Sequence, residues 1–200
     1  RVSENKWNFE GPLLVYTGTF GMINGLSYLV ELARELQVIE SNVNILITGN
    51  GKELGDIIGL SKDFNVLNDN FFIHEPIKKS ELPELLSIAS MSCNIVIDNQ
   101  DVWNNSANKF FDGLASGTPM MVNSGGWQSD LIMRHKAGIC TYGLTLRESA
   151  EKIHVLLNNK KWIADTGVNA LNLAKMKFDK VNLVDNLHLV LVEASLGRGK

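Results

Sequence analysis

The sequence predicts an α/β fold: a doubly wound parallel sheet of about six strands with helices on both faces and a helical C-terminal region. Short apolar segments alternate with helical patterns between residues 13 and 141. These segments are continuously apolar, as in strands that are covered on both faces. Glycine-rich turns separate them, and only helical patterns follow residue 145. Such alternation favours parallel strands joined by right-handed crossovers.

The first half of the chain contains three predicted strands and three predicted helices. Strands are expected over 13–17, 43–48 and 71–74. Helices are expected over 26–38, 52–63 and 82–89. Apolar residues three and four positions apart indicate the first helix. Ser80, with Glu84 beyond it, predicts the start of the third helix.

The second half continues the alternation and then becomes helical. Strands are expected over 94–97, 119–123 and 138–141. Helices are expected over 106–115, 146–157, 161–175 and 181–194, and a further short helix is expected to end at Arg134. Gly117, with Pro119 beyond it, predicts the end of the helix that begins at Ser106.

Composition excludes several classes of protein. The 19 basic and 22 acidic residues give a net charge of −3 with no basic block, which argues against a nucleic-acid partner. The only cysteines, Cys93 and Cys140, lie in apolar runs and are read as buried free thiols. No metal-ligand spacing and no membrane-spanning run occur, so we expect no metal and a cytoplasmic location. The polar residues 3–6 suggest a chain cut inside a linker.

Ligands of doubly wound sheets bind beyond the carboxyl ends of the strands, where the strand order reverses. The candidate loops are 18–25, 49–52, 74–79 and 98–109, with 124–127 as a fifth. Gly18, Gly21 and Gly25 do not have the Gly-x-Gly-x-x-Gly spacing of dinucleotide sites, and the second strand ends at Thr48-Gly49 without the acidic ribose partner. A dehydrogenase is therefore disfavoured. Tight turns alone would also explain these glycines.

Residues 104–122 form the most informative segment. Ser106 is a candidate N-cap, which would leave the amides of Ala107, Asn108 and Lys109 free to bind an anion. Asp112, one turn on, could accept hydrogen bonds from the vicinal hydroxyls of a ribose or sugar. An ordinary capped helix with a surface pair between Lys109 and Asp112 explains the same residues.

The segment Asn108-Lys-x-Phe-Asp-x-Leu-Ala-x-Gly-x-Pro resembles the donor-site signature of glycosyltransferase family 4, or group 1, of the type found in bacterial polysaccharide biosynthesis. Other segments agree in order and spacing: Tyr16-Thr-Gly-Thr-Phe-Gly, Ile47-Thr-Gly-Asn-Gly and Phe72-x-x-x-Pro76. The resemblance covers about residues 13–194, and only the C-terminal half of the family. It implies one of two facing Rossmann-like domains of the GT-B fold, the one that binds the nucleotide-sugar donor.

The resemblance also implies roles for individual residues. Asp112 matches the second acidic residue of the family motif, which binds the ribose, whereas the first acidic position falls on Asn104. Thr19 and Asn24 replace basic residues that bind the diphosphate in many relatives. Lys52 or Lys109 would supply the positive charge instead.

The remaining donor contacts are expected from two loops. His74 and Ile77 match the segment that holds the base, and Gly18 and Gly21 would let the phosphates approach closely. The donor-binding set is therefore Ser106, Ala107, Asn108, Lys109, Asp112, Asn104, Gly18, Thr19, Gly21, Lys52, His74 and Ile77. Trp127 and His74 also have plain structural interpretations, as a packing tryptophan and a hydrogen-bonded imidazole.

The expected function is donor binding in a retaining glycosyltransferase. A sugar would pass from a nucleoside diphosphate sugar, with UDP the expected nucleotide, to a glycan or lipid-linked acceptor, without a cofactor. The expected organisation is a linker remnant over 1–12, the donor domain over 13–194 and a disordered tail over 195–200. The apolar last helix would dock on an absent N-terminal acceptor domain or, as a second interpretation, on the inner face of the membrane. A nucleotide-sugar epimerase and a noncatalytic binding module are the alternatives.

Overall fold

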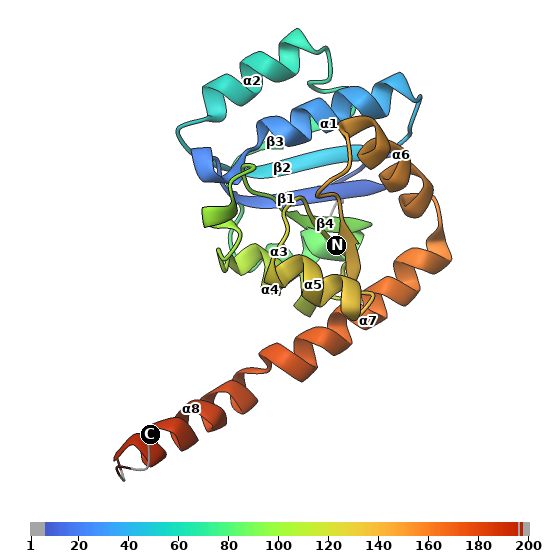
Figure 1. Cartoon of the computed structure of the whole chain (residues 1–200). Helices are drawn as coiled ribbons and strands as arrows, with labels where there is room; N and C mark the ends of the chain where they lie inside the picture. Colours follow the sequence, from blue (N-terminus) through green and yellow to red (C-terminus); the bar gives the residue numbers. More distant parts are fainter. Residues whose placement is uncertain (1–6, 196, 198–200) are drawn as a thin grey trace, which may run out of the picture.

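The computed structural model describes residues 7–195 and residue 197, and their central feature is one parallel sheet (Figure 1). In the described part of the chain six strands lie in the order β3-β2-β1-β4-β5-β6. They are β1 (Leu13–Thr19), β2 (Asn44–Asn50), β3 (Phe71–His74), β4 (Met91–Asn94), β5 (Met120–Val122) and β6 (Gly138–Cys140). The predicted doubly wound parallel sheet is confirmed.

The two longest strands, β1 and β2, form the centre of the sheet. They pair in register over their whole length, from Leu13 opposite Asn44 to Thr19 opposite Asn50. Four consecutive residues of β1, 13–16, are buried because helices cover both faces of the sheet. The strand order reverses between β1 and β4, so this edge of the sheet is the expected place for a ligand.

Helices form a layer on each face of the sheet, as Figure 1 shows. One layer contains α1 (Ser27–Val38), α2 (Leu54–Asp63) and α6 (Leu146–Leu157). The opposite layer contains α3 (Leu82–Ile88), α4 (Asn108–Ala115), α5 (Trp127–Arg134) and α7 (Lys160–Phe178). Two single turns of 3₁₀-helix, η1 (Met22–Asn24) and η2 (Gln100–Val102), lie in loops.

The apolar core differs between the two faces. Beneath α1 and α6 one cluster is continuous across the sheet, from Phe71 of β3 to Ile139 of β6. The opposite face has two separate clusters. We call them the α4 cluster, built around Phe110 and Leu114, and the α3 cluster, built around Leu85 and Val15.

The fourth strand is the main correction to the predicted elements. It was expected over 94–97, but β4 is Met91–Asn94. Pairing decides its position, because Leu14 of β1 lies opposite Met91. The later residues bond to loops: the amide of Val96 donates to Asn123 Oδ1 and the amide of Ile97 to the Ile23 carbonyl, at 2.9 and 3.0 Å.

The start of α3 also differs in detail. Leu82 begins the helix as expected, but Ser80 does not cap it. The N-cap residue is Glu81, which makes no capping side-chain bond at that position and instead accepts a hydrogen bond from the amide of Lys78 at 2.9 Å.

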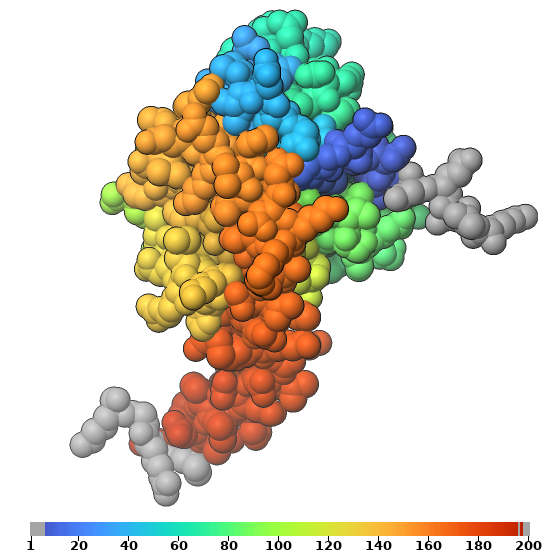
Figure 2. Space-filling view, turned by 90° about the vertical axis from the view of Figure 1, so that its right-hand side faces the viewer, coloured from blue at the N-terminus to red at the C-terminus, as the bar shows by residue number. Residues whose placement is uncertain are grey.

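The two ends of the described chain contrast. Trp7 is only 4% exposed and packs in the α3 cluster, and Phe9 lies edge-on to Phe72. Helix α8 (Lys180–Ser195) has no buried residue and extends away from the body in Figures 1 and 2. Its exposed apolar residues include Leu187, Leu189 and Leu191. Of the segments assigned to a linker and a tail, residues 1–6, 196 and 198–200 lie outside the described residues.

No helix of the described residues is long and apolar enough to cross a membrane.

Candidate functional site

A crevice of about 640 Å³ lies at the carboxyl edge of the sheet, beside the reversal of strand order. Its volume falls within the range of about 300–1,000 Å³ that is typical of small-molecule sites. The ends of β1 and β2, the β3–α3 loop and the start of α4 line it. The lining residues are Thr17, Gly18, Thr19, Asn24, Thr48, Gly49, Asn50, Pro76, Ile77, Lys78, Lys79, Leu82, Ala107, Asn108, Lys109 and Asp112.

Two glycines form the floor where β1 and β2 end. Gly18 and Gly49 pair across the strands and have φ angles of +138° and +153°, which side chains rarely adopt. A Cβ at position 49 would collide with the carbonyl oxygen of Gly18. Glycine therefore lets the two strand ends lie close together, with their backbone facing the crevice.

Lys109 is the most enclosed cation of the crevice. Its half-buried ammonium lies 4.7 Å from the centre of the Tyr16 ring and 3.3 Å from Asn24 Oδ1. Burial lowers the pKa of Lys109. Burial likewise raises the pKa of Cys93, to about 12, so this thiol stays protonated at neutral pH.

The alternative interpretation, a surface pair between Lys109 and Asp112, does not hold. Among the residues that the structure describes, the Lys109 ammonium contacts Tyr16 and Asn24, and no ion pair joins it to a carboxylate. Asp112 lies one turn further along α4, half-buried in the crevice lining. The two charges are therefore available to a ligand separately.

The capping role expected of Ser106 is also wrong. Helix α4 begins at Asn108, and its N-cap is Ala107, which is extended at φ −81° and ψ 138° and makes no side-chain cap. The amide of Phe110 donates to the Ala107 carbonyl at 3.1 Å. By their position, the first amides of α4, those of Asn108 and Lys109, have no acceptor within the helix. Both residues line the crevice.

The structure brings together part of the predicted donor set. Ala107, Asn108, Lys109 and Asp112 of the α4 region line the crevice with Gly18 and Thr19 of β1 and Ile77 of the β3–α3 loop. Five predicted residues are outside this lining: Ser106, Asn104, Gly21, Lys52 and His74. Ser106, Asn104 and Lys52 are exposed, and Gly21 is half-buried at the start of η1.

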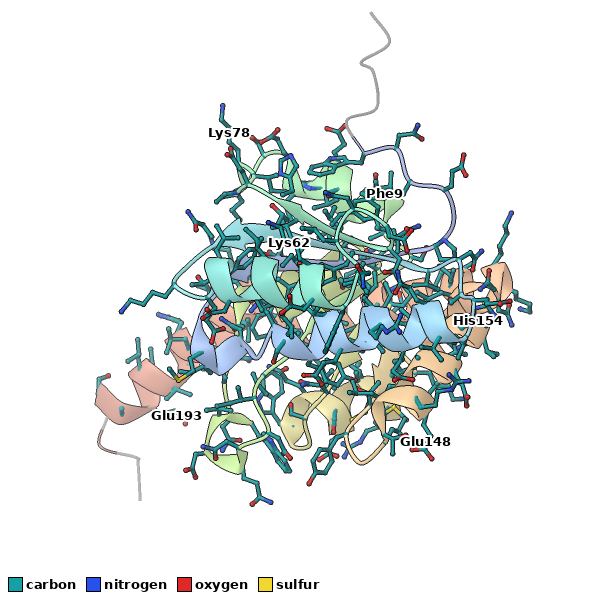
Figure 3. All side chains as sticks on the ribbon, turned by 90° about the horizontal axis from the view of Figure 1, so that it is seen from above. Phe9, Lys62, Lys78, Glu148, His154 and Glu193 are labelled. Atoms are coloured by element: carbon teal, nitrogen blue, oxygen red, sulfur yellow. The ribbon has the colours of Figure 1, made fainter. Side chains whose placement is uncertain are left out.

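His74 lies in an adjoining hollow of about 700 Å³ between α2 and the end of β3. Its Nδ1 is 2.8 Å from the Glu75 carbonyl, and its ring packs edge-on against Trp7. This agrees with the structural interpretation of a hydrogen-bonded, half-buried imidazole. Figure 3 shows the labelled Lys78 of the crevice at the opposite side of the molecule from His154 of α6.

The loop that carries Asn104 is held by buried amides. Asn94 Nδ2 donates to Gln128 Oε1 at 2.6 Å, and Gln128 Nε2 donates to the Asn105 carbonyl at 2.7 Å. Trp127 follows the packing interpretation, because its ring lies 5.4 Å from that of Phe110 in the α4 cluster. The 124–127 loop is absent from the described crevice lining.

Sequence reasoning missed several lining residues, notably Thr48, Asn50, Lys78 and Lys79. Thr48 Oγ1 donates to the Glu75 carbonyl at 2.6 Å and so ties β2 to the β3–α3 loop. Position supplied the available signal, because Thr48 and Asn50 lie near the end of β2, and Lys78 and Lys79 lie in the loop after β3. Their loops were predicted, but no residue type distinguished them from other polar loop residues.

Comparisons with known proteins give structural matches only. No protein-family model and no curated protein matches the sequence. TarM from S. aureus, crystallised with UDP, matches with a TM-score of 0.75 at 17% identity. HepE from Anabaena, in complex with UDP and glucose, matches with a TM-score of 0.76 at 13% identity. The C-terminal domain of the glycosyl transferase group 1 family protein LpcC from Francisella tularensis matches with a TM-score of 0.69 at 13% identity.

The matched lengths show how much of each similar protein this chain spans. The matches cover 89% of this chain but 35% of TarM, and 92% of this chain but 48% of HepE. For the LpcC domain they cover 86% and 89%. The chain thus has the fold of a GT-B glycosyltransferase domain, and it spans between a third and a half of the TarM and HepE chains.

Proposed function

We propose that this chain is the nucleotide-sugar donor-binding domain of a glycosyltransferase and that its donor is a UDP-sugar. One observation carries the proposal. Lys109 and Asp112 of α4 and Ile77 of the β3–α3 loop line a single crevice at the reversal of strand order. A nucleoside diphosphate needs a cation and amide donors for its phosphates, an acceptor for its ribose hydroxyls and an apolar surface for its base. Lys109 with the first amides of α4, Asp112 and Ile77 would supply these in turn.

The diphosphate is proposed to bind at the end formed by Gly18, Thr19, Lys109 and the first amides of α4. Amides at a helix N-terminus bind phosphate well because the helix dipole is positive there. When the sugar leaves, negative charge grows on the departing diphosphate. A fixed ammonium and fixed amides stabilise that charge more in the transition state than in the ground state, which is how they would accelerate transfer.

The nucleoside is proposed to bind between Asp112 and the β3–α3 loop. The carboxylate of Asp112 accepts hydrogen bonds from the two ribose hydroxyls. The half-buried side chain of Ile77 and the adjacent Pro76 cover one face of the base. In this arrangement Asp112 orients the donor and takes no proton from it.

The finer assignments extend the proposal to a whole enzyme. We assign the chain to the C-terminal domain of glycosyltransferase family 4, with retention of the anomeric configuration and a glycan or lipid-linked acceptor. The motif of residues 108–119 supports this assignment, as do UDP complexes of the similar proteins TarM and HepE. The acceptor would bind on a second domain that faces the crevice, and the enzyme would work in the cytoplasm or at the inner face of the membrane.

A nucleotide titration followed by NMR tests donor binding. The chain is titrated separately with UDP, GDP, ADP and NAD. We expect UDP to shift the amide resonances of Asp112, Lys109 and Ile77, with His154 at the far side of the molecule as the internal control. A larger response to NAD would favour a dehydrogenase. If neither UDP, GDP nor ADP shifts the resonances of these residues, the donor site is refuted.

A transfer assay tests the division of labour between domains. With UDP-glucose and a mixture of glycan acceptors, we expect this chain to bind the donor without transferring sugar, because the acceptor site is assigned elsewhere. Product is measured by release of UDP in the presence and absence of acceptor. Acceptor-dependent release by this chain alone would contradict that assignment.

A further inference from the structure

The side chain of Asn24 connects the β1–α1 loop to the cation of the crevice. Its amide nitrogen donates to the Thr19 carbonyl at 2.9 Å, and its amide oxygen accepts from Lys109 Nζ at 3.3 Å. We propose that Asn24 is a positioning residue, whose amide holds the Lys109 ammonium at the diphosphate end of the crevice. This inference rests on the proposed function.

The orientation of the Asn24 amide follows from its two partners. Thr19 offers a carbonyl, which accepts hydrogen bonds only, so the NH₂ group must face it. The oxygen therefore faces Lys109, whose ammonium donates only. The backbone of Asn24 is itself held in η1, where its amide donates to the Gly21 carbonyl at 2.8 Å. The Asn24 side chain is thus held at its backbone by η1 and at its amide by the contacts with Thr19 and Lys109.

Tyr16 and Gly18 also restrict the position of the Lys109 side chain. The Tyr16 hydroxyl donates to the same Thr19 carbonyl at 2.8 Å, so its ring is locked beside the ammonium. At Gly18 a Cβ would lie 3.0 Å from Lys109 Cε, so a larger residue there would press on the lysine stem. The end of the Lys109 side chain is therefore surrounded by the ring of Tyr16, the backbone of Gly18 and the side-chain amide of Asn24.

The neutrality of Asn24 matters for an anionic ligand. A carboxylate in the same place would also orient the ammonium, but it would cancel the positive charge and repel a diphosphate. An amide oxygen orients Lys109 and leaves its full charge in place. The lowered pKa of Lys109 agrees with an ammonium that has lost part of its water and gained no anionic partner.

A double-mutant cycle with UDP and uridine tests whether Asn24 acts through Lys109. We expect Asn24→Ala to weaken UDP binding about three- to tenfold and to leave uridine binding unchanged, because uridine has no phosphates. In a Lys109→Met background the same change should cost nothing further. Additive losses in the cycle would overturn the proposal. Met22→Ala is the matched control, because that side chain lies on the same turn and is 75% exposed.

Replacement by aspartate provides a second variant of nearly the same shape, which keeps the test valid if Asn24→Ala fails to fold. Asn24→Asp should raise the pKa of Lys109, read from the ¹³Cε resonance of labelled lysine, and weaken UDP binding more than Asn24→Ala does. Equal or tighter UDP binding by Asn24→Asp would contradict the role of neutrality.

The lysine resonance also separates this inference from the proposed function. If the native chain fails to bind UDP, the donor site is wrong. The Lys109 signal in the free protein still reports on positioning, because Asn24→Ala should shift it and Met22→Ala should not. A Lys109 resonance that is the same in the native chain and in Asn24→Ala would overturn the positioning role whatever the result with UDP.

Discussion

The two faces of the sheet are packed in different ways. Beneath α1 and α6 a single apolar cluster runs without a break from β3 to β6. The opposite face is divided into the α3 cluster and the α4 cluster, and the crevice is lined by the loop before α3 and by the start of α4. The site therefore lies at the carboxyl edge of the sheet, and two of its walls come from the face where the packing is divided.

The two sides of the crevice supply different residues. On the α3 side these are the apolar Pro76, Ile77 and Leu82 and two exposed cations, Lys78 and Lys79. The α4 side supplies the amides, Lys109 and Asp112. A buried hydrogen bond joins α3 to the loop after α4, because Thr118 Oγ1 donates to the Leu86 carbonyl of α3 at 3.1 Å.

The largest expected effect comes from breaking the α4 cluster. Phe110 is fully buried and contacts the rings of Phe111, Trp127 and Phe178. Phe110→Ala should lower the free energy of unfolding by about 3–5 kcal/mol, because it removes a large side chain and leaves a cavity. Urea denaturation measures the change.

The control for this variant is Val190→Ala in α8, where the side chain is 60% exposed. It should change the free energy of unfolding by no more than about 0.5 kcal/mol. Similar losses in the two variants would show that α8 packs as tightly as the α4 cluster.

The hydrogen bond between α3 and the loop after α4 gives the next effect. Thr118→Val keeps the shape of the side chain but leaves the Leu86 carbonyl without its donor. We expect a loss of about 1–3 kcal/mol in the free energy of unfolding. Thr118→Ser, which keeps the hydroxyl, should lose less than the valine variant. Thermal denaturation of the pair decides whether the hydroxyl matters.

Asp112 tests the α4 side of the crevice without disturbing the core. Asp112→Asn should weaken UDP binding by about 1–3 kcal/mol, or roughly five- to 150-fold, because ribose hydroxyls lose a charged acceptor. Asp130→Asn on the exposed start of α5 is the matched control and should bind UDP as the native chain does. Isothermal titration calorimetry measures both, and an unchanged affinity in Asp112→Asn would remove this residue from the site.

The smallest expected effect is a pH dependence from Lys109. Burial lowers its pKa below the usual lysine value of about 10.4. The charged form binds diphosphate, so UDP affinity should be constant near neutral pH and fall as the pH rises through the lowered pKa. We expect less than about a tenfold loss, because solvent screens a half-exposed charge.

Lys109→Met is the reference for this measurement. Dividing the native UDP affinity by that of the variant at each pH removes any titration of the ligand itself. A ratio that stays constant up to the ordinary lysine pKa would contradict the role of Lys109.

Much of the fold could be predicted from sequence because its strands are short apolar runs with clear breaks. The strand that begins at Leu13 and the one over Phe71–His74 begin where the pattern predicts. The fourth strand could not be placed, since residues 91–96 are all buried and offer no periodicity. Pairing with Leu14 selects its register, and that partner is distant in sequence.

The candidate site was predictable as a set of loops and less so as a set of side chains. Lys109 and Asp112 follow from a motif on one helix and lie in one crevice. Ser106 looked like a cap, but the helix begins two residues later, where insertion of Phe110 into the α4 cluster sets its position. The contact between Lys109 and Asn24 joins residues 85 positions apart, so no local pattern could reveal it.

The exposure of α8 has a practical consequence for work with this chain. Phe178 is the last residue that packs in the α4 cluster, and no residue of the helix after it is buried. A truncation that ends at Asp179 should therefore keep the fold and the crevice. It would remove the exposed apolar side chains of α8, which favour self-association in concentrated NMR samples.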